Sequence, residues 1–148
     1  MKIVIANDHA AVELKKEIQD YIESMGHQVV NIGTDSHASC HYPEYGKKAA
    51  EMVASGEVDL GVLICGTGVG ISLAANKVKG IRCGVCSDTT TAHLIREHNN
   101  ANMIAFGARI VGAELAKDIV KSFLEAKFEG GGRHQIRIDM ISAIENEK

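Results

Sequence analysis

Aromatic residues are scarce in this chain of 148 residues, which has no tryptophan, three tyrosines and three phenylalanines. Proteins that bind single-stranded nucleic acids without sequence preference stack bases on aromatic side chains, and this chain offers few of them. Its formal net charge of −3 is also opposite to the basic balance of a protein that binds a phosphate backbone. The composition therefore argues against a nucleic-acid partner.

Long apolar runs are also missing from the sequence. No segment approaches the roughly 20 apolar residues that a membrane-spanning helix requires. The N-terminus becomes polar at Asn7 and Asp8, too early for a secretory signal peptide. We therefore expect a cytoplasmic protein with no membrane partner, whose four cysteines are free thiols.

The remaining composition is typical of one globular domain. The chain has the length of a single domain, and its hydrophobic fraction of 45% is too high for a disordered protein. No internal repeat, linker or low-complexity tract interrupts it, although the glycines at 130–132 are typical of a hinge. Residues 1–148 are therefore predicted to form a single domain.

Short β-branched runs alternate along the chain with longer segments of helical character. Strands are predicted at 2–6, 28–32, 60–64, 82–86 and 103–106. Helices are predicted at 12–25, from near Pro43 onward, at 69–77, 89–98 and 112–126, and finally at about 133–146. This alternation predicts an α/β fold, a doubly wound, Rossmann-like sheet of five parallel strands with helices on both faces.

Ligands of doubly wound sheets bind beyond the carboxyl ends of the strands, and polar residues follow three of the predicted strands. The richest such segment is 65–72, Cys-Gly-Thr-Gly-Val-Gly-Ile-Ser. Its glycines leave backbone N–H groups free to surround an anion where a helix begins. The spacing G-x-G-x-G after the third strand departs from the dinucleotide fingerprint G-x-G-x-x-G, so a dinucleotide cofactor is not expected.

Cys65 occupies a position in this segment where thiols are reactive. Helix N-termini stabilise the thiolate, which serves either as a nucleophile or as a general base. A cysteine in a sheet is more often a small buried hydrophobic residue. We place Cys83 and Cys86 in that second class, because residues three apart on a strand point to opposite faces and cannot act together.

Other polar residues give weaker signals when each is taken alone. The loop at 37–41 carries two histidines and a cysteine but lacks an evident fourth zinc ligand, so no metal site is predicted. His98 lies at a predicted helix end, which we expect near the ligand-binding edge, and imidazole exchanges protons near neutral pH. Arg133 and Arg137 are four residues apart on a predicted helix, a spacing that suits either a phosphate clamp or a solvated charged face.

In combination, these segments resemble the family of type B ribose-5-phosphate isomerases and galactose-6-phosphate isomerase subunits. The resemblance extends over nearly the whole chain, and its specificity lies in the ordered combination. The matching segments are 7–10 (NDHA), 42–45 (YPEY), 65–72 (CGTGVGIS), 74–77 (AANK), 80–82 (GIR), 96–99 (REHN), 106–109 (FGAR), 128–130 (FEG) and 132–134 (GRH).

The resemblance implies an aldose–ketose isomerisation through a cis-enediolate, without metal or nucleotide cofactor. Cys65 matches the base that moves a proton between C2 and C1, Thr67 the residue that assists at the substrate oxygens, and His98 the residue that opens the furanose ring. The implied substrate-binding positions are Asp8, His9, Tyr42, Gly66, Gly68, Gly70, Asn99, Arg109, Arg133 and Arg137, of which His9 and the three arginines match phosphate ligands.

The same resemblance implies a homodimer, or two such dimers paired into a tetramer. The active site would lie between two subunits, and the last helix would pack on the partner subunit. Residues that are distant in sequence would then converge on one small substrate.

Ribose 5-phosphate and ribulose 5-phosphate are the expected substrate and product. Ala11, His41 and Ser87 stand where the family usually has Gly, Asp and His, and the glycine run before Arg133 is one residue longer. Because loop contacts select the sugar, galactose or allose 6-phosphate or a tetrose phosphate stays open as the substrate. A non-catalytic subunit that only binds a sugar phosphate is the alternative from another functional class.

Overall fold

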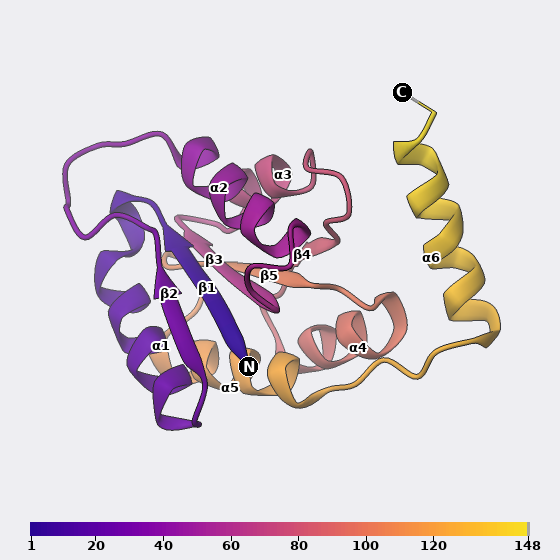
Figure 1. Cartoon of the computed structure of the whole chain (residues 1–148). Helices are drawn as coiled ribbons and strands as arrows, with labels where there is room; N and C mark the ends of the chain where they lie inside the picture. The colour runs from indigo at the N-terminus through magenta and orange to yellow at the C-terminus, as the bar shows by residue number, and fades with distance from the viewer. Residues whose placement is uncertain (148) are drawn as a thin grey trace.

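The computed structural model describes residues 1–147, which form a parallel sheet between two layers of helices (Figure 1). The strands are β1 (Lys2–Asn7), β2 (Gln28–Asn31), β3 (Leu60–Cys65), β4 (Cys83–Val85) and β5 (Met103–Gly107). The helices are the short 3-10 turn η1 (His9–Ala11), α1 (Val12–Ser24), α2 (Tyr42–Ala54), α3 (Val69–Ala75), α4 (Thr89–Asn99), α5 (Ala113–Glu125) and α6 (Gly132–Glu145).

Within the described residues the strands are ordered β2-β1-β3-β5-β4, and each neighbouring pair is parallel. The chain begins in the middle of the sheet, winds outward to β2, returns to β3 and then builds the other half. This topology confirms the predicted doubly wound sheet of five parallel strands. Its central strand β3 is buried along its whole length, as expected for a strand that is covered on both faces.

Two hydrophobic clusters hold the layers together, one on each face of the sheet. On one face α1, α4 and α5 pack through residues such as Ile18, Ala92 and Phe123. On the other face α2 and α3 pack through residues such as Ala50 and Ile71. Helices therefore cover both faces, as the alternating pattern predicted (Figure 1).

Local chemistry explains where several helices begin and end. Pro43 lies in the first turn of α2, where its missing N–H costs no helical hydrogen bond. Asp88 caps α4, because its Oδ1 accepts a hydrogen bond of 2.6 Å from the backbone N–H of Thr91. Asn100 ends the same helix in the left-handed conformation, with φ of 46°.

The last helix, α6, stands apart from these layers and lies nearest to α4 (Figure 1). Its boundaries agree with the predicted helix at about 133–146. Ile138 is its buried residue, whereas Ile136, Met140 and Ile144 are 62%, 65% and 55% exposed. An open cavity of about 610 Å³ lies between α6 and the α3–β4 side of the sheet. Much of the apolar surface of α6 is therefore uncovered in a single chain.

None of the helices formed by residues 1–147 combines the length and the apolar character needed to span a membrane.

Candidate active site

Cys65 ends β3 at the carboxyl edge of the sheet and is 5% exposed. The chain then turns through Gly66, Thr67 and Gly68 before α3 begins. The N–H of Gly68 donates a hydrogen bond of 3.1 Å to Cys65 Sγ. A sulfur that carries negative charge accepts such a bond better than a neutral thiol does. The turn thus directs a backbone amide at the thiol, as the sequence pattern suggested.

The turn is tight because it packs directly on the neighbouring strand β5. Gly68 has φ of +83°, and a Cβ atom at this position would lie 2.7 Å from the backbone of Phe106. Only glycine satisfies both the left-handed conformation and this close approach. The β5 backbone therefore fixes the position of the amide that contacts Cys65.

Asp8 and His9 reach the same edge from β1, which pairs with β3. The N–H of Asp8 donates to the carbonyl of Ile64 at 3.2 Å, so Asp8 lies one strand away from the Cys65 turn. Its carboxylate accepts a hydrogen bond of 3.0 Å from Ala10 N–H and caps η1. These contacts place both residues beside the thiol-bearing turn.

Arg109 and Tyr42 complete this group of residues at the carboxyl edge. Arg109 follows β5, its N–H donates to the carbonyl of Gly66 at 3.0 Å, and its guanidinium lies beside the same glycine. The ring of Tyr42, at the start of α2, occupies the space that a side chain on Gly70 would need. We call Asp8, His9, Tyr42, the 65–70 turn and Arg109 the carboxyl-edge group.

His98 and Asn99 lie at the opposite edge of the sheet, so the expectation that His98 lies near the ligand-binding edge is wrong for a single chain. The helix α4 begins at the carboxyl edge after β4 and returns the chain to the amino edge, where β5 starts. At this end of α4, the carbonyl of Asn99 accepts a hydrogen bond of 3.0 Å from Arg82 Nε, just before β4. A crossover helix between parallel strands necessarily ends at the amino edge.

His98 is accompanied at this edge by residues of α6. Its ring stacks on that of His134, with centroids 4.3 Å apart and an interplanar angle of 8°. Arg133 and Glu97 line the same small cavity, whose volume is about 350 Å³. We call His98, Asn99, Arg133, His134 and Arg137 the amino-edge group.

Sequence reasoning missed His134 as a member of this group. The adjacent Arg133, a candidate phosphate ligand, drew attention to this part of the chain. However, His98, on which His134 stacks, lies on a different helix, and only the tertiary structure brings the two rings together. Desolvation by burial, with the charges of His98 and Arg133, lowers the pKa of His134 below its usual value. His134 is therefore neutral at neutral pH and offers His98 a flat, uncharged surface.

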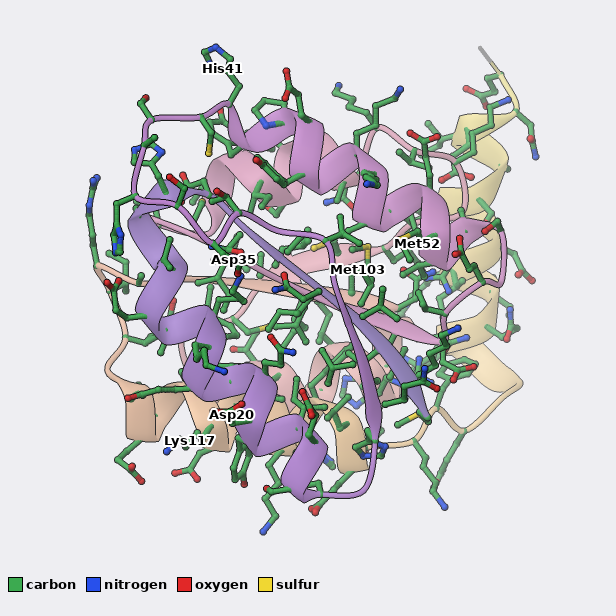
Figure 2. All side chains as sticks on the ribbon, turned by 60° about the vertical axis from the view of Figure 1, so that its left-hand side comes forward. Asp20, Asp35, His41, Met52, Met103 and Lys117 are labelled. Carbon is green, nitrogen blue, oxygen red and sulfur yellow. The ribbon has the colours of Figure 1, made fainter. Side chains whose placement is uncertain are left out.

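The cysteine and histidine residues outside these groups have structural surroundings. Cys83 and Cys86 belong to the hydrophobic clusters on opposite faces of the sheet, which confirms their interpretation as core residues. In the 37–41 loop, His37 contacts Glu13, and the side chain of His41 points away from the body of the molecule (Figure 2). No three histidine, cysteine or acidic side chains gather as a metal site would require anywhere in residues 1–147.

Together, the parallel sheet and the thiol that accepts a backbone N–H at its carboxyl edge define a doubly wound α/β protein with a glycine-rich cysteine turn. A model of the family described as Ribose/Galactose Isomerase matches residues 3–141. The chain belongs to this family.

Individual relatives agree with this assignment over their full length. Ribose-5-phosphate isomerase B of Escherichia coli K12 is 51% identical over 99% of this chain and 98% of its own. The solved structure of ribose-5-phosphate isomerase B from Clostridium thermocellum has a TM-score of 0.97 at 50% identity, covering 99% of both chains. That of the Mycoplasma genitalium enzyme, with bound ribulose 5-phosphate, has a TM-score of 0.94 at 42% identity, covering 99% of this chain and 97% of its own.

The burial of the core cysteines predicts an order of thiol reactivity. Burial raises the pKa of both Cys83 and Cys86 to about 12, so at pH 8 roughly one thiol in ten thousand is ionised. Cys40 is half-buried in a loop. We expect iodoacetamide at pH 8 to label Cys40 at least about 100-fold faster than Cys83 or Cys86. Mass-spectrometric peptide mapping over time measures the rates.

Protein unfolded in urea is the control for this labelling, and there all cysteines should react at similar rates. Labelling of Cys83 or Cys86 in the native protein as fast as that of Cys40 would contradict the burial assigned to them.

Proposed function

We propose that the protein is an aldose–ketose isomerase that interconverts ribose 5-phosphate and ribulose 5-phosphate. The observation that carries this proposal is the position of Cys65, whose Sγ accepts the Gly68 N–H at 3.1 Å in a turn that opens onto the carboxyl edge. The 51% identity to the ribose-5-phosphate isomerase B of Escherichia coli over nearly the full length supports the choice of sugar.

In the proposed reaction Cys65 is the general base. Its thiolate removes the C2 proton of the open-chain aldose, which gives a cis-enediolate, and the thiol then returns that proton to C1. The isomerisation has no net gain or loss of hydrogen or electrons, so it needs no redox cofactor, and the reaction as proposed uses no metal or nucleotide. Acid–base catalysis of this kind contributes roughly 10²–10⁴-fold to the rate.

Thr67 and the backbone of the turn assist at the substrate oxygens. The Oγ1 atom of Thr67 accepts a hydrogen bond of 3.2 Å from Val69 N–H, which leaves its hydroxyl proton to be exchanged with O1 and O2 of the sugar. The first amides of α3 have no carbonyl partner within the helix. Within the 66–70 turn, the Gly68 N–H donates to Cys65 Sγ and the Val69 N–H to Thr67 Oγ1. We assign the other amides of the turn, at Gly66, Thr67 and Gly70, to the oxyanion of the enediolate, because fixed dipoles stabilise a charge that develops during the reaction.

The amino-edge group supplies the remaining roles. His98 opens the furanose ring, and Asn99 binds a substrate hydroxyl, as does Asp8 at the carboxyl edge. Arg133 and Arg137 bind the phosphate together with His9 and Arg109, and Tyr42 contacts the sugar. The stacked His134 orients the ring of His98. These roles require the two groups to come together around one substrate.

A second copy of the chain is the proposed source of the missing half of each site. The helix α4 has 11 residues, about 16 Å of helix, and it separates the two groups by the height of the sheet. The apolar residues Ile136, Met140 and Ile144, exposed on α6, offer a surface for the partner. We therefore infer a homodimer, alone or paired into a tetramer, in which α6 packs on the partner and each site combines both edges.

The proposal also places the enzyme in the cytoplasm. Its cysteines are free thiols, and a cysteine that acts as a base must stay reduced, which the reducing cytoplasm ensures.

Substrate choice is tested with a panel of phosphorylated sugars. We expect the highest kcat/KM with ribose 5-phosphate, at least about tenfold above galactose 6-phosphate, allose 6-phosphate and a tetrose 4-phosphate, because one misplaced hydroxyl costs at least one hydrogen bond. Aldose–ketose conversion is measured by a coupled or chromatographic assay. A higher value for a hexose or tetrose phosphate would reassign the substrate. No turnover with any member would favour a non-catalytic binding subunit.

The role of Cys65 is tested by proton exchange. The Cys65→Ala variant should bind ribose 5-phosphate but lose at least about 10³-fold of both turnover and exchange of the C2 proton with solvent deuterium. Nuclear magnetic resonance of the sugar measures exchange, and calorimetry measures binding. Cys86→Ala, the same change in the buried core, is the matched control and should retain exchange. Full exchange in Cys65→Ala would remove Cys65 from the role of base.

The shared site is tested by subunit complementation. Cys65→Ala and His98→Ala are each expected to be inactive on cyclic ribose 5-phosphate. After co-refolding, random pairing makes about half of the dimers hybrid with one intact site each, so about a quarter of wild-type activity should return. Each variant refolded alone is the control. If the mixture stays inactive while hybrids are detected by mass spectrometry, the site does not combine the two subunits.

A further inference from the structure

The loop between β2 and α2, residues 32–41, makes a specific contact with His9. The backbone N–H of Cys40 donates a hydrogen bond of 3.2 Å to Nδ1 of His9, and Cys40 Sγ lies 3.7 Å from the same nitrogen. A ring nitrogen that accepts a hydrogen bond carries no proton, so neutral His9 must be protonated on Nε2. The loop thereby selects one of the two imidazole tautomers.

Two buried side chains hold this loop at the carbonyl oxygen of Thr34. Nδ2 of Asn7 and Nζ of Lys15 each donate to it at 3.0 Å. Asn7 is fully buried, and the side chain of Lys15 is 1% exposed. A carbonyl that receives two donors from the body of the domain is fixed both in position and in direction.

The ammonium of Lys15 is fully engaged with this segment. Besides Thr34 it contacts Oδ1 of Asn31 at 3.3 Å and the carboxylate of Asp35, which lies beside α1 (Figure 2). An ammonium group has three donors, and these partners use all of them. The hydrogen bond from Lys15 lowers the pKa of Asp35, so the carboxylate stays charged well below neutral pH.

Burial of a lysine costs free energy unless its charge is paired and its donors are satisfied. Here every donor is directed at the strand end and the loop beside His9, and none at solvent. The neighbour Lys16 shows the contrast, because its side chain is 73% exposed and its Nζ lies 3.6 Å from Asp20, one turn along the same helix.

We propose that Lys15 is a positioning residue for His9. It holds the 32–41 loop so that the Cys40 amide keeps His9 in the Nε2–H tautomer, and this N–H, on the side of the ring away from the loop, donates to the phosphate of the substrate. The inference rests on the proposed function, which assigns His9 to the phosphate.

The first test is the tautomer of His9 in the unmodified protein. Nitrogen-15 chemical shifts distinguish a protonated ring nitrogen from an unprotonated one, and a His9→Gln variant assigns the signals. We expect neutral His9 to have a protonated Nε2 and an unprotonated Nδ1. A protonated Nδ1 would overturn the proposal, and this measurement requires no activity and no destabilised variant.

The second test compares Lys15→Met with Lys16→Met, the matched control on the same helix. In Lys15→Met we expect mixed tautomers of His9, a KM for ribose 5-phosphate raised about tenfold, and kcat within about threefold of wild type, because one hydrogen bond to a charged group is weakened. The inhibition constant of inorganic phosphate should rise by a similar factor. Lys16→Met should match the wild type in all these measurements.

The outcomes separate this proposal from the proposed function. A raised KM with an unchanged His9 tautomer would overturn the role of Lys15 and leave the isomerase assignment intact. If no sugar phosphate is turned over, the proposed function fails, whereas the tautomer measurements still decide what Lys15 does. If Lys15→Met does not fold, the variant Asp35→Ala removes an exposed partner of the Lys15 ammonium. It should likewise give a mixture of the two His9 tautomers.

Discussion

In a sheet of parallel strands, every connection has to return the chain across the full height of the sheet before the next strand can begin. Cys65 ends a strand and His98 ends a helix, so this constraint places them at opposite edges. The arrangement of the whole candidate site follows from it. Residues after strands form one group, residues at the end of α4 and on α6 form another, and one chain alone keeps the groups apart.

The turn after Cys65 in the carboxyl-edge group is tightly packed because backbone lies directly on backbone there. The turn after Cys65 lies against β5 so closely that Gly68 has no room for a side chain. The amide that donates to Cys65 Sγ is therefore placed by the sheet itself rather than by mobile side chains. The amino-edge group is built differently, since α6 leaves the layers and makes its contacts through side chains such as the His98–His134 stack.

Sequence patterns predicted the five strands, the parallel doubly wound sheet and the turn at Cys65, because these depend on local periodicity and on glycine spacing. They also assigned Cys83 and Cys86 to the core, since alternation along a strand is a local rule. They did not place His98 at the correct edge, because that edge depends on the direction in which α4 crosses the sheet, which a short motif around His98 does not show. They missed His134 and Lys15, whose roles come from contacts between helices and loops that are distant in sequence.

By itself, then, the sequence determined the fold class and the family, both of which are encoded in short ordered segments. Tertiary structure decided which residues meet. A lysine on an amphipathic helix has the pattern of a surface residue, yet Lys15 is buried because the 32–41 loop folds over it and accepts its hydrogen bonds. Such burial depends on the path of a segment that carries no periodicity, and only the folded chain fixes that path.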